Sequence, residues 1–134
     1  MESFYTKLTG VTHDNDDTDK PRNRQAIIKK FVKAEEILLL EREPYNQYDK
    51  NAIAVYVVPL DDPWGEDQYR VGYLTGELAK KIAPLMDSGH RAVCQVQNVT
   101  GGEKDKKTKG VNVLVEVYTP EEVAAYYKNK SEKY

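Results

Sequence analysis

EREPYNQYDKNAIAVYVV, residues 41–58, joins two apolar runs through a polar turn, and the rest of the chain can be interpreted around it. Pro44, Asn46 and Asn51 are turn formers, and the aspartate between the two asparagines can accept hydrogen bonds from nearby backbone N–H groups. These residues predict one fixed loop. The run that begins at Ala52 is apolar without alternation, which predicts a strand buried on both faces.

The length and composition are those of one small domain. A chain of 134 residues can bury a core without disulfides or metals. The single Cys94 lies in an alternating strand pattern and is interpreted as a small buried residue. A formal net charge of −2 does not indicate general affinity for polyanions, so any DNA binding must come from a local patch.

The sequence gives no sign of a membrane segment. No apolar run approaches the roughly 18 to 20 residues of a membrane span. The N-terminal residues MESFYTKLTG lack the apolar region of a signal peptide. We therefore expect a soluble, cytoplasmic protein without membrane association.

Hydrophobic periodicity predicts about six strands. Val113 and Val115 alternate with Asn112, Leu114 and Glu116, and together with Ile53, Val55 and Val57 they are expected to point into the core. The strands are expected at residues 4–11, 37–40, 52–58, 69–74, 92–97 and 111–117, with the last two paired antiparallel. This count is compatible with a small closed sheet, and the class is mainly β, a β-rich α+β domain.

Two or three short helices are expected between and after the strands. The first follows Pro21 and has a cationic side that includes Arg24, for which a solvent-exposed face is the simpler interpretation. The second starts at the N-cap Thr75, and Pro84 should bend it or end it early. A capping box that begins at Thr119 predicts a C-terminal helix over residues 119–129. Residues 1–134 are thus interpreted as one domain with its core at roughly 4–118.

No residue pattern indicates a catalytic or metal site. Asp14, Asp16 and Thr18 fit the first, third and fifth places of a calcium loop, but the required glycine and the final glutamate are missing. Two histidines and one cysteine give no zinc spacing, and no nucleotide-binding or nucleophile motif is present. We expect a binding protein without enzyme activity, metal or cofactor.

The order E-P-x-N-x-Y-D-x-N-A-I-x-V in residues 43–55 resembles the HIRAN domain. The resemblance covers roughly residues 4–117 and continues in Gly10-Val11, Arg24-Gln25, Val71-Gly72-Tyr73-Leu74, Glu77-Leu78-Ala79, Gly101-Gly102 and Gly110-Val111. It implies an OB-like small β-barrel. It also implies a non-catalytic module, because ATP-driven activity in HIRAN-containing remodelling proteins belongs to a separate motor domain.

The resemblance further implies a DNA 3′-end site. In the family, the tyrosine and aspartate of an N-P-Y-D motif lie at the pocket that captures the 3′ end of single-stranded DNA, and these positions correspond to Tyr48 and Asp49 here. The tyrosine would stack on a base, and the carboxylate would accept a hydrogen bond from the terminal hydroxyl. Tyr73, at the place of a family histidine, can also stack. The alternative is structural, with Asp49 capping the turn and Tyr48 covering the barrel end.

Phosphate contacts are expected from Arg24, Lys80 and Lys81, because a family lysine is replaced by Gly76. A lysine-rich segment before Gly110 is a further basic patch. Structural roles are favoured for the remaining motif positions, which are Gly10, Pro44, Asn46, Asn51, Ala52 and Gly72.

Two functions remain in competition at the level of sequence. The first is a non-catalytic module that recognises single-stranded DNA 3′ ends in DNA repair or replication-fork processing, with a helicase or nuclease as candidate partner. The second is a protein-interaction adaptor that kept the barrel without DNA affinity. The choice between DNA and RNA and the oligomeric state are left open.

Overall fold

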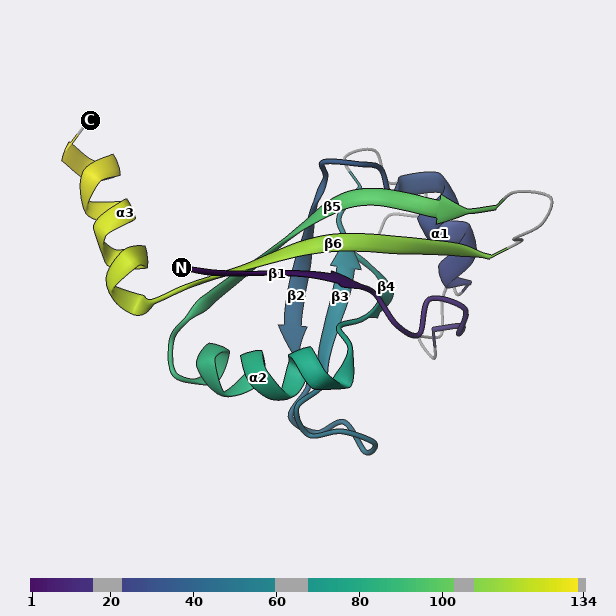
Figure 1. The fold of residues 1–134 in the computed structure, drawn as a ribbon, viewed down its shortest axis with the longest axis horizontal. Coiled ribbons are helices and arrows are strands. Elements are labelled where there is room, and N and C mark those ends of the chain that lie inside the picture. Colours follow the sequence, from purple (N-terminus) through teal and green to yellow (C-terminus); the bar gives the residue numbers. More distant parts are fainter. Residues whose placement is uncertain (16–22, 60–67, 103–107, 133–134) are drawn as a thin grey trace.

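The computed structural model describes residues 1–15, 23–59, 68–102 and 108–132. These residues form six strands and three helices, so the mainly β class is confirmed (Figure 1). Their order is β1 (Glu2–Lys7), α1 (Arg24–Phe31), β2 (Ile37–Arg42), β3 (Ile53–Val57), β4 (Tyr69–Tyr73), α2 (Gly76–Asp87), β5 (Arg91–Gly101), β6 (Lys109–Tyr118) and α3 (Pro120–Glu132). All strand pairs are antiparallel, and the strand order is β1-β6-β5-β2-β3-β4.

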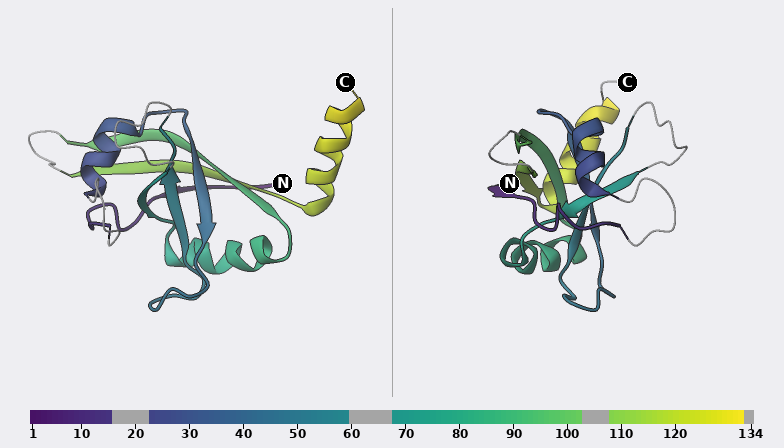
Figure 2. Two further views of the ribbon diagram at one scale, coloured as in Figure 1. Left: turned by 180° about the vertical axis from the view of Figure 1, so that it is seen from behind. Right: turned by 90° about the vertical axis from the view of Figure 1, so that its right-hand side faces the viewer.

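The sheet curls until its two outer strands meet. Just after β1, the Thr9 N–H donates to the Tyr73 carbonyl at 2.8 Å and the Tyr73 N–H donates to the Thr9 carbonyl at 2.9 Å. A Cβ at position 72 would lie 2.7 Å from the Thr9 carbonyl oxygen, so Gly72 is what permits this approach. The β3–β4 and β5–β6 pairs each contain a register shift, which bends the strands. The result is a small closed barrel in which the long β5 and β6 cross β2 and β3 (Figures 1 and 2).

The barrel core consists of the residues that the apolar patterns predicted. Ile53, Val55, Val57, Val113 and Val115 are each at most 2% exposed. The whole of β3 is buried on both faces, in agreement with its unbroken apolar run. Alternating valines in β6 fill the same interior, and the only cysteine is also fully buried.

Helix α2 runs through its proline. The Thr75 hydroxyl caps it by accepting from the Leu78 N–H at 3.3 Å, as expected. The helix continues past Pro84 to Asp87, so of the two outcomes expected at this proline, a bend or an early end, the early end is wrong. Proline removes only its own N–H donor, and the next turn closes normally because the Ser88 N–H donates to the Pro84 carbonyl at 3.1 Å.

Helix α3 projects away from the barrel (Figures 1 and 2). It starts with the predicted capping box, in which Thr119 and Glu122 exchange two hydrogen bonds of 3.1 Å. Tyr126 and Tyr127 on this helix are 61% and 49% exposed. None of the three helices, over the described residues, has the length and apolar character needed to span a bilayer.

Candidate nucleic-acid interface

The β2–β3 connection, residues 43–52, is called the signature loop below, and it is built from two consecutive β-turns. The Asn46 N–H donates to the Glu43 carbonyl and the Ala52 N–H donates to the Asp49 carbonyl, both at 3.0 Å. The Glu43 N–H closes the base of the loop by donating to the Ala52 carbonyl at 2.9 Å. Pro44 occupies the second position of the first turn, where its fixed φ is favoured.

Asn46 organises the middle of the signature loop. Its Oδ1 accepts from the N–H groups of Tyr48 and Asp49 at 2.9 and 3.1 Å, and its Nδ2 donates to Glu43 Oε1 at 3.0 Å. Asp49 Oδ1 accepts in turn from the Asn51 N–H at 2.8 Å. These side-chain bonds give the backbone one arrangement, as the turn-forming residues predicted.

Two tyrosine rings of the signature loop face solvent. Tyr48, which the sequence singled out, is 89% exposed, and Tyr45 is 91% exposed. The sequence pattern did not predict a role for Tyr45, because the family pattern has no fixed residue at that position. The available signal was its position directly after Pro44, at the corner of a turn, where a side chain points outward.

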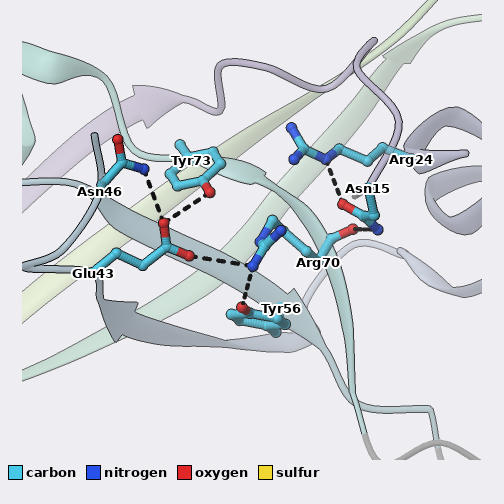
Figure 3. A network of polar contacts seen from close by, with 7 residues as sticks. All are labelled: Asn15, Arg24, Glu43, Asn46, Tyr56, Arg70 and Tyr73. Atoms are coloured by element: carbon cyan, nitrogen blue, oxygen red, sulfur yellow. Dashed lines mark hydrogen bonds and ion pairs between the residues drawn. The ribbon is translucent and has the colours of Figure 1, made fainter. Parts of the chain in front are cut away.

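A polar network connects the signature loop to the barrel wall (Figure 3). Glu43 accepts from the Tyr73 hydroxyl at 2.9 Å through Oε1 and from Arg70 Nη2 at 3.3 Å through Oε2. Arg70 Nη2 also donates to the Tyr56 hydroxyl at 3.0 Å. The Glu43 and Arg70 side chains are only 20% and 17% exposed, so little water competes for these bonds.

Tyr73 belongs to this network more than to the surface. Burial, followed by its hydrogen bond to the Glu43 carboxylate, raises the pKa of Tyr73 to about 12, so the hydroxyl remains a donor at neutral pH. The guanidinium groups of Arg24 and Arg70 lie 5.5 and 5.8 Å from the centroid of its ring. The ring is half-buried and already has two cationic neighbours.

Arg24 is buried, and the exposed position expected for it is wrong. It is 6% exposed, with Nε donating to Asn15 Oδ1 and Nη1 donating to the Gly10 carbonyl, both at 2.7 Å. Gly10 presents that carbonyl from a positive φ of 69°, a conformation that favours glycine. Asn15 also donates to the Arg70 carbonyl at 3.1 Å, which joins the segment after β1 to β4.

The other two predicted phosphate contacts lie on α2. Lys80 and Lys81 are exposed, and Lys81 Nζ lies 4.9 Å from the centroid of the Phe4 ring on β1. The structure therefore places Lys81 beside β1 and Arg24 beside Tyr73. Helix α2 is tied to the start of the signature loop by a bidentate pair, in which Arg42 donates to Asp87 at 3.0 and 3.1 Å and lowers the pKa of that carboxyl.

Several positions weighed in the sequence lie outside the described residues, including Asp16 and Thr18 of the rejected calcium series and most of the lysine-rich segment. Within residues 1–15, 23–59, 68–102 and 108–132, no three His, Cys, Asp or Glu side chains are grouped to hold a metal ion.

Comparisons with known proteins found one matching family model and similar solved structures. No curated protein matches the sequence. Two solved structures share the fold. The HIRAN domain of human HLTF is 22% identical, with a TM-score of 0.55 over 92% of this chain and 81% of that chain. A protein from Lactobacillus plantarum is 21% identical, with a TM-score of 0.54 over 87% of this chain and 99% of that chain. The barrel is therefore OB-like. Because the HIRAN domain model matches residues 1–122, which is most of the sequence, the chain belongs to the HIRAN domain family.

Proposed function

We propose that this HIRAN domain binds the 3′ end of single-stranded DNA through the signature loop and has no catalytic activity of its own. HIRAN domains are generally nucleic-acid-binding modules. The observation that carries the proposal is the Tyr48 ring, 89% exposed and directly followed by Asp49, on a loop whose backbone is already fixed by hydrogen bonds. An exposed ring on an ordered loop can stack on a base without paying for loop ordering.

Asp49 can serve the fold and the ligand together. Its Oδ1 accepts from the Asn51 N–H at 2.8 Å, which is the capping role that the structural alternative required. An ionised carboxylate offers about four acceptor sites, so one bond leaves room for a terminal 3′ hydroxyl. A 3′ phosphate would instead bring two anions together and remove the hydrogen bond.

Lys80 and Lys81 are the proposed phosphate contacts. Both are exposed on α2, and the Arg42–Asp87 pair fixes the far end of that helix to the start of the signature loop. Arg24 is proposed to support Tyr73 from its buried position at the start of α1 instead, because only 6% of it is exposed. A module that recognises free 3′ ends would act in DNA repair or replication-fork processing, beside a helicase or nuclease.

The test uses short labelled strands that differ only in their ends, with binding measured by fluorescence anisotropy. A 3′ phosphate should weaken binding by about 1 to 3 kcal/mol, roughly tenfold to a hundredfold, whereas a 5′ phosphate should be nearly neutral. Asp49→Asn should relax the discrimination between 3′ hydroxyl and 3′ phosphate strands. The matched control Glu41→Gln, on the exposed face of β2, should not. Equal binding of both 3′ ends by the wild-type protein would remove the end-capture mechanism.

One observation favours the alternative of a protein-interaction adaptor. Between α3 and the barrel is a hollow of about 740 Å³, whose lining includes Val93, Tyr118, Val123 and the exposed Tyr126. Exposed apolar surface of this kind is typical of protein contacts. A salt titration separates the two functions: affinity for DNA should fall as salt rises, and an adaptor should form no DNA complex to titrate.

A further inference from the structure

We infer that Tyr45 is a second base-stacking residue. Tyr45 and Tyr48 would then each stack on one of two nearby bases of the same DNA strand. This inference rests on the proposed DNA binding and extends it from the terminal nucleotide to its neighbours. It assigns a role to a residue that the family pattern leaves variable.

Both rings of the signature loop are almost fully exposed. Tyr45 and Tyr48 are 91% and 89% exposed, the highest values among the exposed large hydrophobic side chains of the described residues. A tyrosine ring normally gains stability by burial, and rings that stay in solvent close to one another are typical of a binding surface. Stacking on a base would bury the ring face and leave the hydroxyl in water.

The shape of the loop keeps the two rings close together. Asn46 turns inward, because its Nδ2 donates to the half-buried Glu43 and its Oδ1 accepts from the Tyr48 N–H. Tyr45 and Tyr48 are three residues apart, which limits their Cα separation to about 10 Å. Stacked bases follow one another at roughly 3.4 Å along a strand, so two rings within this distance can serve the same few nucleotides.

Tyr73 is less suited to be the second stacking ring. It is half-buried, its hydroxyl is bound to Glu43 at 2.9 Å, and two guanidinium groups lie within 5.8 Å of its ring centroid. A base that stacked on it would compete with these neighbours. Tyr45 has no such obligation to the fold, because almost its entire surface is in solvent.

The signature loop is preorganised around both rings. The backbone on either side of both rings is fixed by the turn bond from the Asn46 N–H to the Glu43 carbonyl and by the two bonds to Asn46 Oδ1. Ordering a tyrosine then costs the freedom of only two side-chain torsions, which is why tyrosine suits sites that must bind without rearrangement.

The experiment pairs protein variants with abasic positions in the DNA. Tyr45→Ala should weaken binding of a single strand of about ten nucleotides by roughly 5- to 150-fold, the range for one base–aromatic stack, and Tyr45→Phe should bind like the wild type. Tyr126→Ala is the matched control, because Tyr126 is 61% exposed on α3, which projects away from the barrel (Figure 1). An abasic site is then moved through the positions next to the 3′ end.

In the wild type, one abasic position should cost a similar loss of affinity. That position should cost Tyr45→Ala almost nothing, because the ring that its base would contact is already absent. The ratio of affinities for 3′ hydroxyl and 3′ phosphate strands should be the same in Tyr45→Ala and in the wild type.

Wild-type discrimination between 3′ ends, combined with unchanged affinity in Tyr45→Ala, would overturn the inference and leave the proposed function standing. A wild-type protein that binds no strand would overturn both. Loss of affinity in Tyr45→Ala with an unchanged abasic profile would also reject the stacking role. Circular dichroism and the melting temperature should not change. If they do, a wild-type scan without a sensitive position next to the terminal nucleotide would still overturn the inference.

Discussion

Replacing Glu43 with alanine should destabilise the domain more than any other single change in the signature loop. Glu43 accepts from the Tyr73 hydroxyl, from Arg70 and from the Asn46 amide, at 2.9, 3.3 and 3.0 Å. Alanine leaves all three donors without this acceptor. The arginine would then be a mostly buried cation without its carboxylate, since its side chain is 17% exposed.

The expected loss can be estimated from these contacts. Removing one partner of a fully buried ion pair costs about 3 to 5 kcal/mol, and each hydrogen bond to a charged group contributes about 1.5 to 3 kcal/mol. Glu43 and Arg70 retain 20% and 17% exposure, so entering water compensates for part of the loss. We expect the free energy of unfolding to fall by about 2 to 4 kcal/mol, which at this chain length corresponds to roughly 6 to 20 °C in melting temperature.

The measurement is urea denaturation followed by circular dichroism. The matched control is Glu41→Ala, two residues earlier on the exposed face of β2, which should change stability by no more than about 0.5 kcal/mol. In the Glu43→Ala background, Tyr73→Phe should cost almost nothing further, whereas in the wild type it should cost about 0.5 to 1.5 kcal/mol. Equal losses for Glu43→Ala and Glu41→Ala would refute the network as a source of stability.

Three further predictions test other parts of the structure. Gly72→Ala should destabilise by about 1 to 3 kcal/mol in urea denaturation, because its Cβ would meet a carbonyl oxygen at 2.7 Å, whereas Gly76→Ala has open space and should be neutral or stabilising. Burial raises the pKa of the Cys94 thiol from 9.0 to about 12. The contribution of the buried thiol to stability is therefore complete below pH 9 and is lost as the pH rises towards 12. Across this pH range, the free energy of unfolding should fall less steeply in Cys94→Ala than in the wild type. The double substitution Lys80→Ala and Lys81→Ala should weaken binding of all DNA strands alike. It should also reduce the slope of log affinity against log salt concentration by roughly 0.7 to 1 unit per lost phosphate contact, and an unchanged slope would show that neither lysine contacts phosphate.

The strands could be predicted because their side-chain period is local information. Val113 and Val115 alternate with partly buried neighbours, and the run from Ile53 to Val57 is apolar throughout. The closure between Thr9 and Tyr73 could not be predicted in the same way, because the sequence of neither segment identifies the other as its partner. The barrel was implied only by the family resemblance.

In the candidate site, too, local interactions could be predicted and contacts between distant segments could not. The turn formers Pro44 and Asn46 have preferences that act within a few residues, so the loop was predictable. The burial of Arg24 was not predicted, because a cation on a helix is ordinarily solvated and its partners Asn15 and the Gly10 carbonyl approach from another segment. The role of Glu43 could not be predicted for the same reason, because an acidic residue before a proline does not indicate a hydrogen bond with Tyr73 on β4.

The signature loop separates residues that set its shape from residues that can meet a ligand. Asn46 and Glu43 use their side chains for bonds within the protein, while Tyr45 and Tyr48 leave nearly all of theirs in solvent. Asp49 does both, because one carboxylate can cap the turn and still accept another donor. Loss of Glu43 should therefore reduce DNA affinity only through loosening of the loop, and low temperature should restore part of it. Loss of a tyrosine ring should reduce affinity at every temperature at which the barrel is folded, because the ring contributes no bond that holds the loop in place.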